Sequence, residues 1–250
     1  MTLPAPTPAD PPWLLPAIPP EQVQAAAARL PQMYPVKPGE WLRRDAAWAA
    51  QLAEKARLIA GDRDRVIATL PGAEAAAEEL LDLVLADLPL HGFTVGQGVT
   101  RPDGTTVPIR RDDPLATIAT LIQEDVCIHQ KQGDEHVLTA AQVCFPSSWT
   151  LAEKIGRPLT RIHQPVAHYD GNIAARVQRM FDMVGTDRIL WRANLLRHHD
   201  PALFHAYTEA NPRPPGRPDS PFLRSERQTL RRLPRTGAVV FTIHTSLARA

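Results

Sequence analysis

The residue type and setting best suited to chemistry in this chain is a histidine placed between two prolines. His163 stands in RIHQPV, with Pro158 before it and Pro165 after it. Proline fixes its own φ angle and restricts the residue before it, so we predict a rigid, extended segment that holds the imidazole still. A fixed imidazole suits an axial ligand of porphyrin iron, which leaves the opposite face for dioxygen. A purely structural histidine is the alternative.

The segment at 222–233, FLRSERQTLRRL, alternates as a strand would but carries polar side chains on both faces. A strand in a small domain normally buries one face, and such departures concentrate at functional sites or interfaces. Guanidinium groups pair with carboxylates, so Arg224, Arg227 and Arg231 could hold propionates or an acidic partner surface. Glu226 is either a site carboxylate or the local counter-ion. A solvated, salt-bridged strand is the alternative for the whole segment.

Two other histidine positions are weaker candidates for a ligand of iron. His198 and His199 precede a turn signal at 200–201, so we expect a solvated loop there. His244 lies on a polar face of a predicted strand, and that face is either wet or lines a pocket. His244 is therefore the next candidate ligand if His163 does not bind iron.

Composition excludes several classes of protein. The 250 residues include 28 Lys+Arg and 27 Asp+Glu, a balance that argues against nucleic acid, which is bound by a surplus of basic residues. Cys127 and Cys144 occur without a CxxC pair, so the chain offers no cysteine set for an iron–sulfur cluster or zinc. No apolar run approaches the roughly 20 residues of a membrane span, and no signal-peptide pattern opens the chain. We expect a globular, cytoplasmic protein without membrane contact.

Sequence periodicity predicts an α+β fold, with helices packed on an antiparallel sheet. Apolar residues at helical spacing predict three helices, over 40–60 (ended by Gly61), 73–86 and 172–184. Alternation predicts strands over 118–129, 137–145, 189–195 and 239–245. We expect these strands to lie too far apart in the sequence for a simple series of hairpins.

The first 38 residues are dense in proline, which disfavours regular structure. We predict an extended N-terminal arm over 1–38, followed by one domain over 39–250. The arm also carries Trp13, Leu14 and Ile18, which are too apolar for a solvated tail. Part of the arm is therefore expected to pack onto the domain.

Three stretches carry a family resemblance: LRSERQTLRRLPRTGAVVFTIHT (223–245), PSSWTLAEKIGRPLTRIHQPV (146–166) and LIQEDVCIHQK (121–131). They resemble the α subunits of haem-dependent oxidative N-demethylases, also described as dimethylamine monooxygenase subunits, from about Trp41 to the C-terminus. The resemblance implies a PAS-like fold that encloses haem b. It implies oxidative demethylation of a small secondary amine such as dimethylamine, with release of formaldehyde and dioxygen as oxidant.

The resemblance also implies residue roles and partners. Ile162, His163, Pro165 and Val166 match the family's IHxPV block, which makes His163 the candidate proximal ligand of haem iron. In the ERQ block, Arg224, Glu226 and Arg227 become pocket or propionate candidates, and Arg231 joins them. Electrons would come from NADPH through FMN and a 2Fe–2S cluster on partner subunits, in agreement with the cysteine count. By residue chemistry, Glu226 would hold the amine and take its proton.

The chain departs from the family pattern at two points. It stops at Ala250, where members usually continue, and Ala167 replaces a second proline after the IHxPV block. We expect the shorter C-terminus to leave the haem pocket more open. The alternatives to an enzyme are a non-catalytic haem-binding or scaffold PAS-like module, and an inactive partner subunit that uses the arginine segment as an interface.

Overall fold

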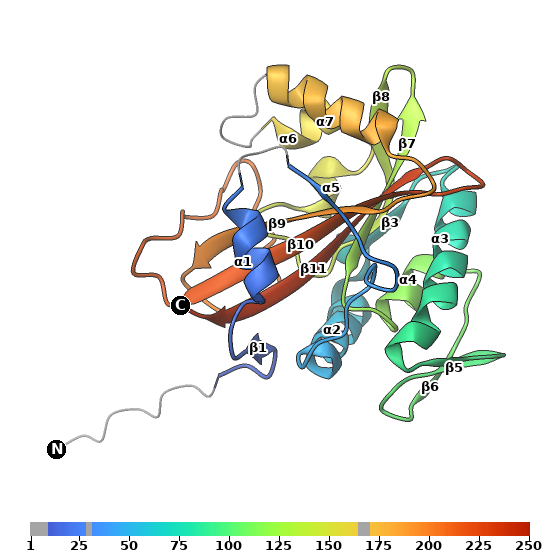
Figure 1. The fold of residues 1–250 in the computed structure, drawn as a ribbon, viewed down its shortest axis with the longest axis horizontal. Helices are drawn as coiled ribbons and strands as arrows, with labels where there is room; N and C mark the ends of the chain where they lie inside the picture. Colours follow the sequence, from blue (N-terminus) through green and yellow to red (C-terminus); the bar gives the residue numbers. More distant parts are fainter. Residues whose placement is uncertain (1–9, 29–31, 165–170) are drawn as a thin grey trace.

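In the computed structural model, which describes residues 10–28, 32–164 and 171–250, helices pack on a large antiparallel sheet (Figure 1). The long strands are β7 (Asp125–Gln132), β8 (Glu135–Gln142), β9 (Leu190–His198), β10 (Phe222–Arg232) and β11 (Val239–Arg249). The short strands of this sheet are β1 (Leu14–Leu15), β2 (Tyr34–Pro35) and β3 (Ile67–Thr69). The predicted α+β class is confirmed.

The strands hydrogen-bond in the order β2-β9-β10-β11-β7-β8-β3, and β1 adds to β11 in parallel. β7 and β8 form a hairpin, and β9, β10 and β11 follow one another as antiparallel neighbours. β11 also pairs with β7, and a long loop joins β9 to β10, so the strands do not form a simple series of hairpins, as expected. A separate small sheet contains β4 (Thr94–Val95), β5 (Gly98–Thr100) and β6 (Thr106–Pro108).

The helices and the 3-10 turn η1 flank the sheet. They are α1 (Pro20–Ala26), α2 (Trp48–Val66), α3 (Glu74–Asp87), η1 (Leu88–His91), α4 (Pro114–Ala119), α5 (Leu151–Lys154), α6 (Leu159–His163) and α7 (Gly171–Met183). The helices predicted over 73–86 and 172–184 are confirmed as α3 and α7. Among the described residues no helix is long and apolar enough to cross a membrane.

Two predicted element bounds are wrong, each for a local reason. The first helix begins at Trp48 rather than residue 40, because Trp41 enters the core from a non-helical segment whose spacing only resembles a helix. The helix continues past Gly61 and is kinked at Asp62, which has φ −142° and ψ 50°. The strand predicted from residue 118 starts at Asp125, because Pro114 opens α4 at the first helical position, where a missing N–H costs nothing.

The described part of the N-terminal segment contains regular structure, so the prediction of an extended arm is wrong there. It forms α1, β1 and β2, and both strands join the main sheet. The indole of Trp13 donates to the carbonyl of Pro201 at 2.8 Å, and the amide of Gln22 accepts from Ser225 Oγ at 2.8 Å. The expected packing of this segment onto the domain is confirmed by these contacts.

The two faces of the main sheet are covered by different helices (Figure 1). We call the side under α5, α6 and α7 the α7 face; its core contains Leu159, Phe181, Leu230 and Val239. We call the side under α2, α3 and α4 the α2 face; its core contains Trp41, Leu52, Leu80, Val126 and Val240. Because side chains alternate along a strand, β10 sends Arg224 and Glu226 to the α7 face and Arg227 and Arg231 to the α2 face.

Candidate functional site

His163 is the last residue of the short helix α6, so the predicted extended segment is wrong. Pro158 has φ −71° and occupies the N-cap position, where proline precedes a helix rather than breaking one. Of the IHxPV block, Pro165 and Val166 lie outside the described residues. α6 packs on the α7 face through Leu159, which places His163 on that side of the sheet.

The hydrogen bonding of His163 defines its tautomer. Its Nδ1 lies 2.9 Å from the carbonyl oxygen of Leu159, one helical turn earlier. A carbonyl can only accept, so Nδ1 carries the proton and Nε2 carries the lone pair of the neutral ring. Burial lowers the pKa of His163 and the nearby charges of Lys154 and Arg192 add to this, against the opposing bond to Leu159. The ring is therefore neutral near pH 7, as a metal ligand must be.

Arg224 and Glu226 are the predicted site residues that the structure brings into direct contact. Nη2 of Arg224 lies 3.3 Å from Oε1 of Glu226. The Arg224 guanidinium also donates to the carbonyls of Leu203 at 2.9 Å and Phe145 at 2.5 Å. The Arg224 residue is only 1% exposed, so a solvated, salt-bridged strand does not describe this part of the segment.

Asn194 on β9 lies directly opposite Glu226 and holds it from two sides. Its Nδ2 donates to Oε2 of Glu226 at 3.0 Å, and its Oδ1 accepts from the Glu226 backbone N–H at 2.9 Å. Gln228 also donates to Oε2, at 3.3 Å. Asn194 has no local signature in the sequence, because only the pairing register of β9 with β10 places it opposite Glu226.

Arg192 connects the two predicted site residues on the α7 face. It lies on β9 opposite Gln228, two residues along the strand from Asn194, which is opposite Glu226. The charge of Arg192 lowers the pKa of His163, and the charge of Glu226 opposes the lowering that burial imposes on the pKa of Arg192. Arg192 therefore interacts by charge with both His163 and Glu226.

Arg227 and Arg231 lie on the opposite side of the sheet from Arg224 and Glu226. The guanidinium of Arg227 donates to the backbone carbonyls of Trp41 at 3.0 Å and Glu40 at 2.7 Å. The guanidinium of Arg231 stacks over the Trp41 ring at 4.3 Å. Both arginines thus anchor the segment before α2, and the structure does not bring them to the α7 face.

His244 is neither solvated nor placed in a pocket, so both expectations for it are wrong. It is 2% exposed on the α2 face, with Nε2 3.0 Å from Oδ2 of Asp45 and Nδ1 3.3 Å from Oε1 of Glu124. Burial disfavours the charged ring, but the hydrogen bonds and charges of the two carboxylates outweigh it and raise the pKa of His244 to about 9. Both nitrogens are engaged, which removes His244 as the next candidate ligand.

Three further histidines have buried rings on the strands of the sheet or beside them. His129 and His136 flank Phe181 of α7, with ring centroids 5.2 Å and 5.4 Å from it. His198 was expected in a solvated loop, but β9 extends to it and it pairs with Phe222, which buries the ring. The expectation holds for His199, which is exposed and contacts the carbonyl of Pro215 at 3.1 Å.

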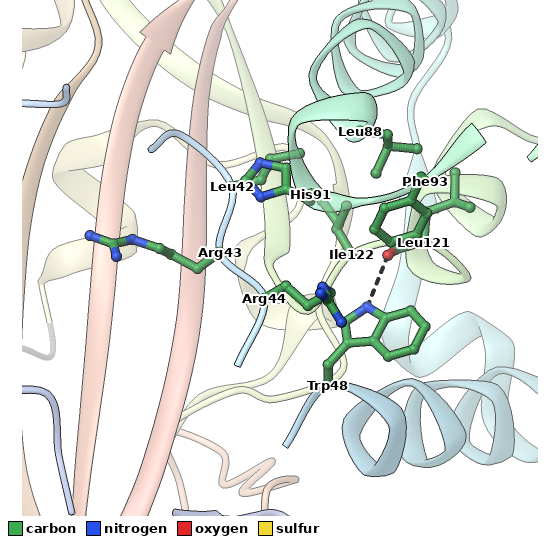
Figure 2. Close-up of a pocket in the computed structure, with 9 residues that line it drawn as sticks. All are labelled: Leu42, Arg43, Arg44, Trp48, Leu88, His91, Phe93, Leu121 and Ile122. Atoms are coloured by element: carbon green, nitrogen blue, oxygen red, sulfur yellow. Dashed lines mark hydrogen bonds between the residues drawn. The ribbon is translucent and has the colours of Figure 1, made fainter. Parts of the chain in front are cut away.

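Two cavities lie away from these residues. One, of about 10 Å³, is lined by Leu42, Arg43, Arg44, Trp48, Leu88, His91, Phe93, Leu121 and Ile122, and Trp48 there donates to the Leu121 carbonyl at 3.3 Å (Figure 2). This volume is near the lower limit for one water molecule. The other, of about 420 Å³, is a charged groove between α2, α3 and the start of α4. Neither is lined by His163, Arg224 or Glu226.

Comparison with known families agrees with the resemblance seen in the sequence. The sequence model described as "Haem-dependent oxidative N-demethylase, alpha subunit-like" matches residues 32–250. The matched region includes α6 with His163, the whole of β10 and both faces of the main sheet. The family description implies haem dependence, an oxidative N-demethylase-like activity and a place in a complex of several subunits. The chain therefore belongs to the haem-dependent oxidative N-demethylase α-subunit-like family.

Proposed function

We propose that this chain is the haem-binding subunit of an oxygenase that removes a methyl group from a small secondary amine such as dimethylamine. The observation that carries the proposal is the bond from His163 Nδ1 to the Leu159 carbonyl. Metal-binding imidazoles usually donate their second ring N–H to a carbonyl or carboxylate, which fixes the tautomer and the ring orientation. His163 has this arrangement on the face that carries Glu226.

The donor chemistry of His163 on the α7 face suits the iron of haem b, and neither of the two cavities described above lies at this residue. His163 would hold the iron through Nε2, and Arg224 would contribute to the charge balance of a propionate. Arg227 and Arg231 were also predicted to contact propionates, but their guanidinium groups are used on the α2 face. The proposal therefore rests on Arg224 alone among these three arginines.

When bound, haem supplies the activation of dioxygen. The overall change balances as dimethylamine, dioxygen, two electrons and two protons giving methylamine, formaldehyde and water. Glu226 would accept a hydrogen bond from the amine N–H and take the proton of the dimethylammonium ion. Asn194 and Arg224 would hold the carboxylate in position for this step, because both already donate to it.

The two electrons would come from partner subunits that carry FMN and a 2Fe–2S cluster and oxidise NADPH. The cysteines of this chain support that division, because Cys127 and Cys144 are both buried free thiols and form no cluster site. Buried free thiols are usual in a reducing compartment, and a cytoplasmic location belongs to the same proposal.

Amine-dependent turnover tests the proposal. The chain, reconstituted with hemin, is incubated with dimethylamine, dioxygen, NADPH and a surrogate flavin and iron–sulfur electron-transfer pair. We expect formaldehyde release and oxygen consumption in a one-to-one ratio, and both should depend on the amine. A red protein that produces no formaldehyde would instead identify a haem-binding module, and a chain that takes up no hemin would identify a scaffold.

A further inference from the structure

The end of β9 gathers buried polar side chains that lack partners. His198 is 1% exposed and His205 is 4% exposed, and their ring centroids lie 4.9 Å apart. Neither nitrogen of His198 has a hydrogen-bond partner among the described residues, and the same holds for Nε2 of His205. Every imidazole carries at least one N–H, so a buried donor is left unsatisfied here. Such groups are rare in folded proteins and require a ligand, an ion or an ordered water.

Arg213 adds a positive charge to this cluster. It is half-buried, makes no ion pair or hydrogen bond with another residue in the described ranges, and its Nε is buried without a partner. The loop that carries Arg213 packs on the end of β9, where the Pro215 carbonyl lies 3.1 Å from Nε2 of His199. From this loop Arg213 contributes, after burial and Arg224, to lowering the pKa of His198. The same charge also lowers the pKa of His205.

Burial lowers the pKa of Arg213 and the charges of Tyr207, Asp200 and Glu226 oppose this, but neither carboxylate forms an ion pair with Arg213 among the described residues. Glu226 is paired with Arg224, and the Asp200 carboxylate lies 3.5 Å from Nε2 of His205. The Tyr207 ring stacks on His205, with ring centroids 6.3 Å apart, and lies beside the cluster. The Arg213 guanidinium and the imidazole N–H groups are donors suited to a carboxylate, and no group of three or more His, Cys, Asp or Glu among the described residues could hold a metal ion, so this set fits an anion better than a metal cation.

We infer that Arg213, His198 and His205 form a binding site for a carboxylate group at the end of β9. The carboxylate has two possible sources with the same chemistry. One is a haem propionate, and this source rests on the proposed function. The other is a free small carboxylic acid, which does not. Arg213 would then supply on the α7 face the propionate contact that Arg227 and Arg231 cannot supply.

Two binding measurements on the full chain distinguish the sources. The first compares hemin with hemin dimethyl ester in the wild type, Arg213→Met and Arg213→Lys, with Arg217→Met, an exposed arginine of the same loop, as the matched control. For a propionate source we expect Arg213→Met to weaken hemin binding roughly tenfold or more, the loss expected for one charged hydrogen bond. Binding of the ester should not change, and Arg213→Lys should lose less.

The second measurement titrates the haem-free chain with sodium propionate and follows the imidazole NMR signals of His198 and His205. For a free-acid source we expect saturable shifts that Arg213→Met abolishes and Arg217→Met retains. Two results together would overturn the site: Arg213→Met prefers hemin over the ester as the wild type does, and propionate causes no saturable shift of the imidazole signals. Ordered water alone would then satisfy the buried ring nitrogens. If the wild type takes up no hemin at all, the proposed function fails, and the propionate titration alone decides the carboxylate site.

Discussion

At the scale of single residues, the neighbours of each imidazole decide its charge. His244 lies between two carboxylates and is held protonated, whereas His163 faces a carbonyl and nearby cations and is held neutral. His244 is buried and His163 is half-buried, and burial alone would lower the pKa of both rings. The difference follows from the partners, and it separates a structural ion cluster from a candidate metal ligand.

The His244 cluster predicts a pH-dependent stability. The folded-state pKa of about 9 lies above the ordinary value of 6.5, so the contribution of His244 is fully present below about pH 6.5 and is lost as pH rises through 9. Loss of the cluster in His244→Gln should lower the free energy of unfolding by about 3 kcal/mol at pH 6. Urea unfolding at pH 6 and pH 9.5 checks this, with His91→Gln as control. If the free energies of unfolding of wild type and His244→Gln differ by the same amount at both pH values, the charged cluster is contradicted.

Glu226 makes a second prediction at this scale. In Glu226→Gln an oxygen remains to accept from Arg224, so the fold should persist, while the negative charge that would bind the amine is lost. We expect KM for dimethylamine to rise roughly tenfold or more, which corresponds to one charge-assisted hydrogen bond. The Soret band of the hemin-loaded protein should not change. Steady-state formaldehyde release measures KM, and an unchanged KM would remove Glu226 from the amine site.

Sequence alone could identify some of these residues but not their grouping. Arg224 and Glu226 stand two residues apart in a strand, so alternation places them on one face, in agreement with their contact at 3.3 Å. Asn194 and Arg213 were missed, because their proximity to Glu226 depends on strand register and on the path of the loop after β9. Neither property has a local signature in residue order.

At the scale of elements, β10 shows why a strand can be polar on both faces and still be central. It lies between β9 and β11 and is buried along most of its length. Its arginines reach past the sheet and donate through their Nη atoms to backbone carbonyls of loops, which partly compensates the buried charges on both sides. The alternation rule located the strand, but it could not foresee that loops would supply the acceptors.

This role for Arg227 gives a prediction that separates structure from haem binding. Arg227→Met would leave the carbonyls of Glu40 and Trp41 without their donor, at a cost of about 1–3 kcal/mol for buried groups. We expect a lower Tm, by about 2–4 °C for each kcal/mol in a chain of this size. Hemin affinity should stay at the wild-type value. Thermal unfolding and hemin titration test both parts. A large loss of hemin affinity with an unchanged Tm would show instead that Arg227 contacts a haem propionate.

Element bounds were less predictable than element types. The helices α3 and α7 could be found from their helical spacing, because each turns one apolar stripe to the core. The strands could be found from their alternation, although the central ones are buried on both faces. The predictions for the start of α2 and for the conformation around His163 were wrong, because Trp41 and Pro158 are each compatible with more than one local structure. Only tertiary packing selects between them.

At the scale of the whole molecule, the sheet separates two tasks. On the α2 face, His244 pairs with Asp45 and Glu124, and Arg227 donates to carbonyls of the segment before α2. On the α7 face, the tautomer of His163 and the carboxylate of Glu226 suit a ligand atom, and ring nitrogens of His198 and His205 have no hydrogen-bond partner among the described residues. Sequence polarity does not distinguish the faces, because both carry charged residues on the same strands.

Ligation of haem iron by His163 can be measured directly with His163→Gly, in which the ring is removed and exogenous imidazole can replace it. Hemin is titrated into wild type, His163→Gly and the control His91→Gly, with circular dichroism to confirm folding. We expect one hemin per chain with a shifted Soret band in wild type and control, loss of both in His163→Gly, and recovery with imidazole. Binding of one hemin by His163→Gly with an unaltered Soret band would show that another residue holds the iron.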